Sequence, residues 1–146
     1  MGNCILHLAL LSALVMGAGC RTAPKGIPSA YRGEFSFDKT ATIAYWDAQS
    51  HWPLEVKARL VRMAIPTLLR IEADRIVVID IASGHSVTQQ VAGLRVRSDV
   101  MQLDLHSNFA QTNKTTTLHY DSRGFWLCEG TLFADYRERF ERAGNP

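Results

Sequence analysis

Apolar and polar residues alternate with a period of two along most of the chain after residue 66. In residues 67–72, for example, Leu69 and Ile71 alternate with Arg70 and Glu72. This pattern is typical of strands with one buried face. The predicted strands cover residues 67–72, 75–81, 87–96, 101–106, 115–120, 125–129 and 133–141. Because short turn sequences separate most of them, we expect an antiparallel meander.

One predicted strand changes the parity of its apolar residues. Val87 and Val91 share one parity, whereas Leu94 has the other. A β-bulge or a glycine bend at Ala92-Gly93 would place both sets on the same face. We therefore expect an irregularity at this point.

The segments before the meander mix strand and helix signals. Residues 33–37 alternate and predict a first strand. Asp38 can cap a helix over residues 39–49, although the β-branched residues of that segment also suit a strand. Apolar residues at helical spacing predict a further helix over residues 53–64, and Pro66 ends it.

A meander with one apolar face must cover that face. Closure into a barrel covers it and removes the exposed edges. We therefore predict a mainly β fold, an antiparallel eight-stranded meander closed as a barrel, with one or two short helices inserted after the first strand. A β-sandwich built from the same strands is the alternative. Eight strands leave room for side chains or for one small ligand.

The first twenty residues differ from the rest, because they contain no Asp, Glu, Lys or Arg and include an apolar stretch from Ile5 to Val15. The stretch ends in Met16-Gly17-Ala18-Gly19-Cys20, which resembles the lipobox of bacterial lipoproteins. The resemblance implies a signal peptide over residues 1–19 and lipidation of Cys20. The alternatives are an ordinary secretory signal or an N-terminal apolar helix, and in these cases Cys20 would have no special role. Arg21 follows the cysteine, which by the same resemblance points to the outer membrane, facing the periplasm.

The mature chain divides into a tether and one domain. Residues 20–30 contain two Pro and one Gly among few large apolar groups, and we interpret them as a flexible tether. The folded domain is expected over residues 31–143. Cys128 would then be the one remaining thiol, and we expect it to be buried.

Charge and composition exclude several classes of protein. The chain has 16 Lys and Arg against 14 Asp and Glu, a balance that does not favour nucleic-acid binding. The 146 residues suit a single domain, and no second long apolar run indicates a polytopic membrane protein.

Short motifs at both ends of the domain resemble the calycin superfamily, which includes small lipocalin-like bacterial lipoproteins. They are Gly33-Glu34-Phe35, Phe37-Asp38 with Ala41-Thr42, and Phe140-Glu141-Arg142. In lipocalins, a Trp of the first strand packs against a terminal Arg. The resemblance implies that Phe35 takes the place of the Trp beside Gly33, and that Arg142, or Arg139, is the cation that closes the barrel.

No motif predicts catalysis, a metal or a cofactor. His51, His85, His106 and His119 lack the spacing of zinc ligands, and Cys-x-x-Cys, P-loop and Gly-x-Ser-x-Gly motifs are missing. Some calycins bind haem through a histidine, but His106 and His119 occupy polar positions that suit a solvated face. Asp80, Asp104 and Asp121 fall on different strands or turns. We therefore expect a protein that is not an enzyme.

These observations favour a lipid-anchored envelope protein whose barrel binds a small apolar ligand. Candidate cavity-lining residues are Phe37, Trp46, Leu69, Met101, Leu103 and Leu105. The aromatic residues Tyr45, Trp46 and Trp52 could cap such a cavity, although ordinary packing of the helical insert is the favoured interpretation. The alternative function is an envelope accessory protein whose filled barrel docks on a protein partner.

Overall fold

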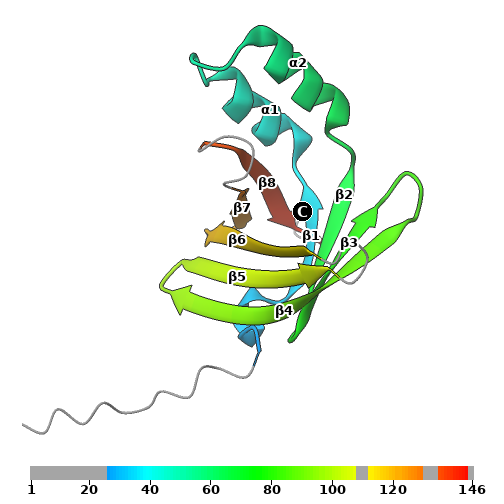
Figure 1. Cartoon of the computed structure of the whole chain (residues 1–146), viewed down its shortest axis with the longest axis vertical. Helices are drawn as coiled ribbons and strands as arrows, with labels where there is room; N and C mark the ends of the chain where they lie inside the picture. Colours follow the sequence, from blue (N-terminus) through cyan, green and yellow to red (C-terminus); the bar gives the residue numbers. More distant parts are fainter. Residues whose placement is uncertain (1–25, 108–111, 130–134, 145–146) are drawn as a thin grey trace, which may run out of the picture.

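The computed structural model describes residues 26–107, 112–129 and 135–144. Its elements follow the chain in this order: η1 (Ser29–Tyr31), β1 (Gly33–Phe37), α1 (Lys39–Asp47), α2 (Leu54–Met63), β2 (Thr67–Ile71), β3 (Arg75–Asp80), β4 (Ser86–Arg97), β5 (Val100–Ser107), β6 (Thr112–Tyr120), β7 (Gly124–Cys128) and β8 (Arg137–Arg142). The strands curve around a common interior, and the two α-helices lie at one end (Figure 1).

The eight strands form a closed antiparallel barrel in which each strand pairs with its neighbours in sequence. The barrel closes where β1 pairs with β8, with Phe35 opposite Arg142 and Phe37 opposite Phe140. The predicted barrel is therefore confirmed, and the β-sandwich alternative is wrong.

The parity change in β4 coincides with a break in its register. The pairing of β4 with β5 shifts between Val91 and Gly93. Val91 lies opposite Leu105 before the shift, and Leu94 lies opposite Leu103 after it. Because Leu103 and Leu105 both face the interior, the bulge returns the apolar side chains of β4 to that face.

Both predicted helices form, so the strand alternative for residues 39–49 is wrong. The Asp38 carboxylate accepts a hydrogen bond from the backbone N–H of Ala41 at 2.9 Å, which caps α1. The helix packs on the outer face of β8, where the Thr42 hydroxyl accepts from the backbone N–H of Arg139 at 2.8 Å. The indole of Trp46 donates to the carbonyl of Arg137 at 2.9 Å.

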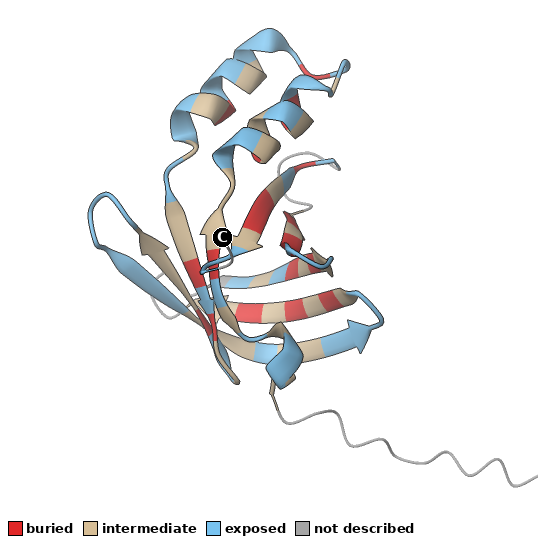
Figure 2. Cartoon of the chain, turned by 180° about the vertical axis from the view of Figure 1, so that it is seen from behind, coloured by how far each residue is buried: buried red, intermediate tan, exposed pale blue. Residues whose placement is uncertain are grey.

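Buried residues form two separate clusters (Figure 2). The larger cluster lies inside the barrel and includes Phe35, Met101 and Phe125. The smaller one joins the helices to the start of β8 and comprises Trp46, Trp52, Leu60 and Tyr136, with partly buried neighbours. The helical insert thus has its own apolar core outside the barrel.

The N-terminal boundary of the folded part differs from the sequence prediction. Ile27, inside the predicted tether, is completely buried in the barrel cluster. Its backbone N–H donates to the carbonyl of Ala73 at 2.7 Å. Ile27 is a single large apolar residue among Pro and Gly, so it is not part of a periodic pattern of apolar residues that would have indicated its burial. Residues 20–25 of the tether lie outside the described residues.

Two strand boundaries also differ. β6 begins at Thr112, because the polar run before residue 115 pairs with β5 instead of forming a loop. β8 begins at Arg137. Residues 133 and 134, where the last strand was predicted to begin, lie outside the described residues.

Candidate functional site

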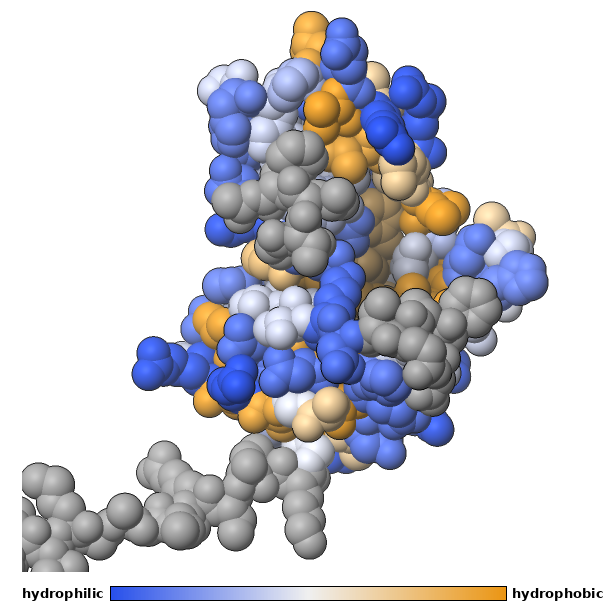
Figure 3. All heavy atoms as spheres, viewed as in Figure 1, coloured by the Kyte–Doolittle hydropathy of each residue, from blue (hydrophilic) through white to orange (hydrophobic). Residues whose placement is uncertain are grey.

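A cavity of about 260 Å³ opens at the end of the barrel beside α2. Its apolar lining combines strand residues with the end of α2 and the segment that follows. These residues are Phe37, Met63, Ala64, Ile65, Leu69, Ile71, Ile76, Val78, Leu105, Leu118, Leu127 and Phe140. Hydrophobic surface gathers in the recess between the helices and the barrel (Figure 3). Most of the residues that line this concave cavity are apolar, as is usual for small-molecule sites, but its surface also includes many polar atoms.

The opposite end of the barrel is filled and closed. Phe35 and Phe125 are completely buried, with ring centroids 4.9 Å apart. Tyr31, at the end of η1, packs edge-on against Tyr120 at 4.7 Å. Its hydroxyl donates to the carbonyl of Ser98 at 2.7 Å, in the turn between β4 and β5. Within the described residues, the cavity is therefore open at the helical end and closed at the other.

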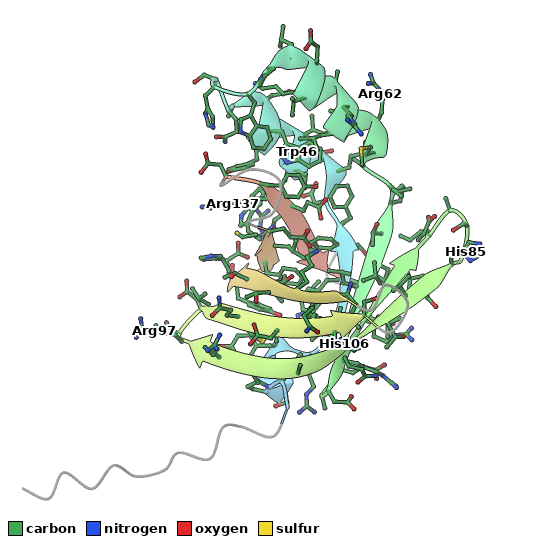
Figure 4. The ribbon with its side chains drawn as sticks, viewed as in Figure 1. Trp46, Arg62, His85, Arg97, His106 and Arg137 are labelled. Carbon is green, nitrogen blue, oxygen red and sulfur yellow. The ribbon has the colours of Figure 1, made fainter. Side chains whose placement is uncertain are left out.

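The six predicted lining residues occupy three different places. Phe37, Leu69 and Leu105 line the cavity. Met101 and Leu103 also face the interior, but they are completely buried in the barrel cluster and do not line the cavity. Trp46 lies outside the barrel, among the helices and β8 (Figure 4). Periodicity identifies the face on which a residue lies but not its depth along the barrel axis.

A polar wall interrupts the apolar lining where β6, β7 and β8 meet the opening. The ammonium group of Lys114 pairs with the carboxylate of Glu129. Glu138 accepts a hydrogen bond of 2.5 Å from the hydroxyl of Tyr136. Burial raises the pKa of the Glu138 carboxyl above its usual value, while the hydrogen bond from Tyr136 opposes that shift. None of these four residues was predicted from the sequence to belong to a site.

Thr116 adds a further polar group to this wall. Its side chain is 2% exposed and lines the cavity. Its hydroxyl has no hydrogen-bond partner among the described residues. Because nearly all buried polar groups in proteins are hydrogen-bonded, this hydroxyl identifies a place where a ligand could supply the missing partner.

Gly33, Phe35 and Arg142 come together at the closed end. The Arg142 guanidinium lies 4.9 Å from the centre of the Phe35 ring, within the range of a cation–π contact. The same group donates to the carbonyls of Arg32 at 3.1 Å and Ala30 at 3.3 Å. A Cβ on Gly33 would lie 2.8 Å from the Arg142 Nη1 atom, so glycine leaves room for the guanidinium.

Arg139, the other candidate for the closing cation, has a different partner. Its side chain is 2% exposed on the outer face, and its guanidinium lies 5.6 Å from the centre of the Trp126 ring. It donates two hydrogen bonds, of 2.5 and 2.9 Å, to the carboxylate of Asp121. These bonds hold the pKa of the Asp121 carboxyl well below its usual range.

The aromatic residues of the insert form packing contacts in the described structure. Trp46 stacks on Tyr136 with ring centroids 5.7 Å apart. The ring of Tyr45 lies 5.4 Å from that of Trp126, on the outer face of β7. Tyr45, Trp46 and Trp52 do not line the cavity. These contacts support the interpretation that the three aromatic residues pack the helical insert and do not cap the cavity.

The remaining candidate polar residues lie apart from one another. His51 is 3.1 Å from Asp135, and His106 is hydrogen-bonded to Asn113 at 2.8 Å. His85 and His106 are well separated on the barrel (Figure 4). Within the described residues, no three His, Cys, Asp or Glu side chains are arranged to hold a metal ion. Cys128 is half-buried rather than fully buried, and burial raises the pKa of its thiol.

Among the described helices, none has the length and apolarity needed to cross a bilayer. No protein-family model matches this chain, and searches of curated proteins and of solved structures found no match.

Proposed function

We propose that this protein is a lipid-anchored envelope lipoprotein with a calycin-like barrel that binds a small apolar ligand without chemical conversion. The cavity at the helical end carries the ligand-binding part of the proposal. The lipobox-like sequence ending at Cys20 supports the anchor and a place at the outer membrane, facing the periplasm. No resident metal or cofactor is part of the proposal.

The size of the cavity limits the ligand. About 260 Å³ lies just below the range of roughly 300–1,000 Å³ that is usual for ligand pockets. The filled half around Phe35 and Met101 prevents the ligand from extending through the barrel. A short or compact molecule fits this space.

A second candidate function is docking on an envelope protein. Exposed apolar side chains gather beside the opening, with Met63 59%, Ile65 54% and Ile81 56% exposed. The backbone N–H of Ile81 donates to the carbonyl of Pro66 at 3.0 Å, which holds these segments together. Exposed apolar patches often mark interaction sites.

Native mass spectrometry of the protein purified from its own host tests the choice between these functions. We expect a copurified small molecule on the unmodified protein and on Val77→Phe. We expect none on Val78→Phe, because Val78 lines the cavity whereas its neighbour Val77 does not. Melting temperatures of both variants show whether the larger side chain disturbs folding. A protein partner without a small molecule would favour docking, and a ligand retained equally by Val78→Phe would contradict binding in the cavity.

The anchor is tested by the intact mass of protein extracted from membranes. The chain should begin at Cys20 and carry the mass of attached acyl chains, which bind the membrane stably when more than one is present. Cys20→Ser should lose this added mass, and Cys128→Ser should keep it. An unmodified mature chain would contradict lipidation.

A further inference from the structure

The polar wall of the cavity contains more acidic than basic groups. Glu129 and Glu138 supply two carboxyl groups, and Lys114 supplies one ammonium group. Since Lys114 is paired with Glu129, Glu138 has no basic partner among the described residues and accepts instead from the neutral Tyr136 hydroxyl. Residues 108–111 and 130–134, which lie outside the described structure, contain no charged residue in their sequence.

Thr116 on β6 and Glu138 on β8, the two groups that can take up a new partner, line the same cavity from the strands on either side of β7. Thr116 is two residues from Lys114 on the same face of β6, so their side chains are neighbours. Cys128 pairs with Arg137, which places the residues that follow them, Glu129 and Glu138, on adjoining strands beside the cavity. The Thr116 hydroxyl can accept a hydrogen bond from a donor placed in the cavity.

The rest of the lining suits an alkyl or aryl group. Ile71, Ile76 and Leu118 are nearly completely buried and line the same cavity as the polar wall. Burial of the ligand's apolar surface against these residues would supply the main driving force for binding. The cavity therefore combines an apolar interior with an acidic, hydrogen-bond-accepting side.

From this combination, and resting on the proposed ligand-binding function, we propose that the cavity takes a small primary amine. Its apolar part contacts the interior, and its ammonium group donates to Glu138 and Thr116. Charged hydrogen bonds of this kind are the stronger ones in proteins. An amine beside Glu138 would also favour the charged form of the carboxylate. A fatty acid would instead add a third carboxylate to a wall whose one ammonium group is already paired.

Methyl NMR of the full chain in phosphatidylcholine nanodiscs can compare hexylamine, hexanol and hexanoate, which share one alkyl chain. The δ1 methyl groups of Ile71 and Ile76 report the cavity, and that of Ile43, in the helical cluster, is the control. We expect hexylamine at neutral pH to shift both cavity methyl groups with a Kd at least about tenfold below that of hexanoate. Hexanol should bind with intermediate affinity.

Two variants test the contacts assigned to the ammonium group. Glu138→Gln retains an acceptor for Tyr136 but removes the charge, and should reduce the preference for hexylamine over hexanoate about tenfold. Thr116→Val removes a hydroxyl without a partner, so the fold should be kept while hexylamine binding weakens several-fold. Thr117→Val, on the outer face of the same strand, should leave the affinity unchanged.

The outcomes separate this inference from the proposed function. If hexanol shifts Ile71 and Ile76 but hexanoate binds as tightly as hexylamine, the cavity binds apolar ligands and the preference for amines is wrong. An unchanged preference in Glu138→Gln would also overturn it. If none of the three compounds shifts either methyl group, the ligand-binding function itself is contradicted.

Discussion

Gly124→Ala is expected to lower the free energy of unfolding by about 3 kcal/mol or more, or to prevent the barrel from closing. A Cβ at this position would lie 2.0 Å from the carbonyl oxygen of Phe140 and 2.9 Å from the Cα of Glu141. Both atoms belong to the backbone of β8, which pairs with β7 here. Relief of the clash therefore requires the two strands to separate. Urea unfolding followed by circular dichroism measures the loss.

Gly84→Ala is the matched control for this substitution. Gly84 lies between β3 and β4, and a Cβ there would meet no heavy atom within 4 Å. Its φ of +71° disfavours alanine, so a loss of only about 1 kcal/mol is expected. Gly124 does not have a positive φ, so a loss there no larger than that at Gly84 would contradict the clash with β8.

Phe35→Ala is expected to cost about 3–5 kcal/mol, the usual range for removal of a buried aromatic ring. Phe35 is completely buried, and its ring contacts those of Phe125 and Tyr120 at centroid distances of 4.9 and 6.2 Å. The substitution would also remove the ring beneath the Arg142 guanidinium. Thermal and urea unfolding measure the change.

Phe37→Ala tests whether the open half of the barrel tolerates the loss of a ring better than the filled half does. Phe37 is only half-buried and already borders the cavity, so its loss should cost about 1–2 kcal/mol. The cavity should become larger, and the variant should accept a bulkier ligand than the unmodified protein does. Equal destabilisation by the two substitutions would contradict the division of the interior into a packed end and an open end.

The period-two pattern predicted the barrel because it repeats over consecutive strands with short connections. It also placed the bulge at Ala92-Gly93 from the change in parity alone. The same parity argument distinguishes the two candidates for the cation that closes the barrel. Arg142 has the same parity as Phe140, which faces the interior, whereas Arg139 has the opposite parity and lies on the outer face.

The polar wall was not predicted because apolar and polar residues do not alternate over most of β6. Residues 112–117 are polar on both faces, so hydrophobicity alone assigns no inward side. Leu118, near the end of this strand, faces the interior. Lys114 and Thr116 have the same parity as Leu118, and this parity could have identified them as inward-facing. Glu138 was hidden for a similar reason, because the charges of β8 alternate in sign along the chain and suggest a solvated edge.

The N-terminal segment that crosses the closed end decides how the molecule would be oriented on a membrane. Ile27 and η1 hold the chain at the end of the barrel away from the helices (Figure 1). In the lipid-anchored protein that we propose, residues 20–26 can span at most about 25 Å even when fully extended, so the closed end of the barrel would stay near the membrane. The entrance would then face away from the anchoring leaflet. A ligand would arrive through the surrounding water or from an opposing surface, and lateral entry from the protein's own membrane would be disfavoured.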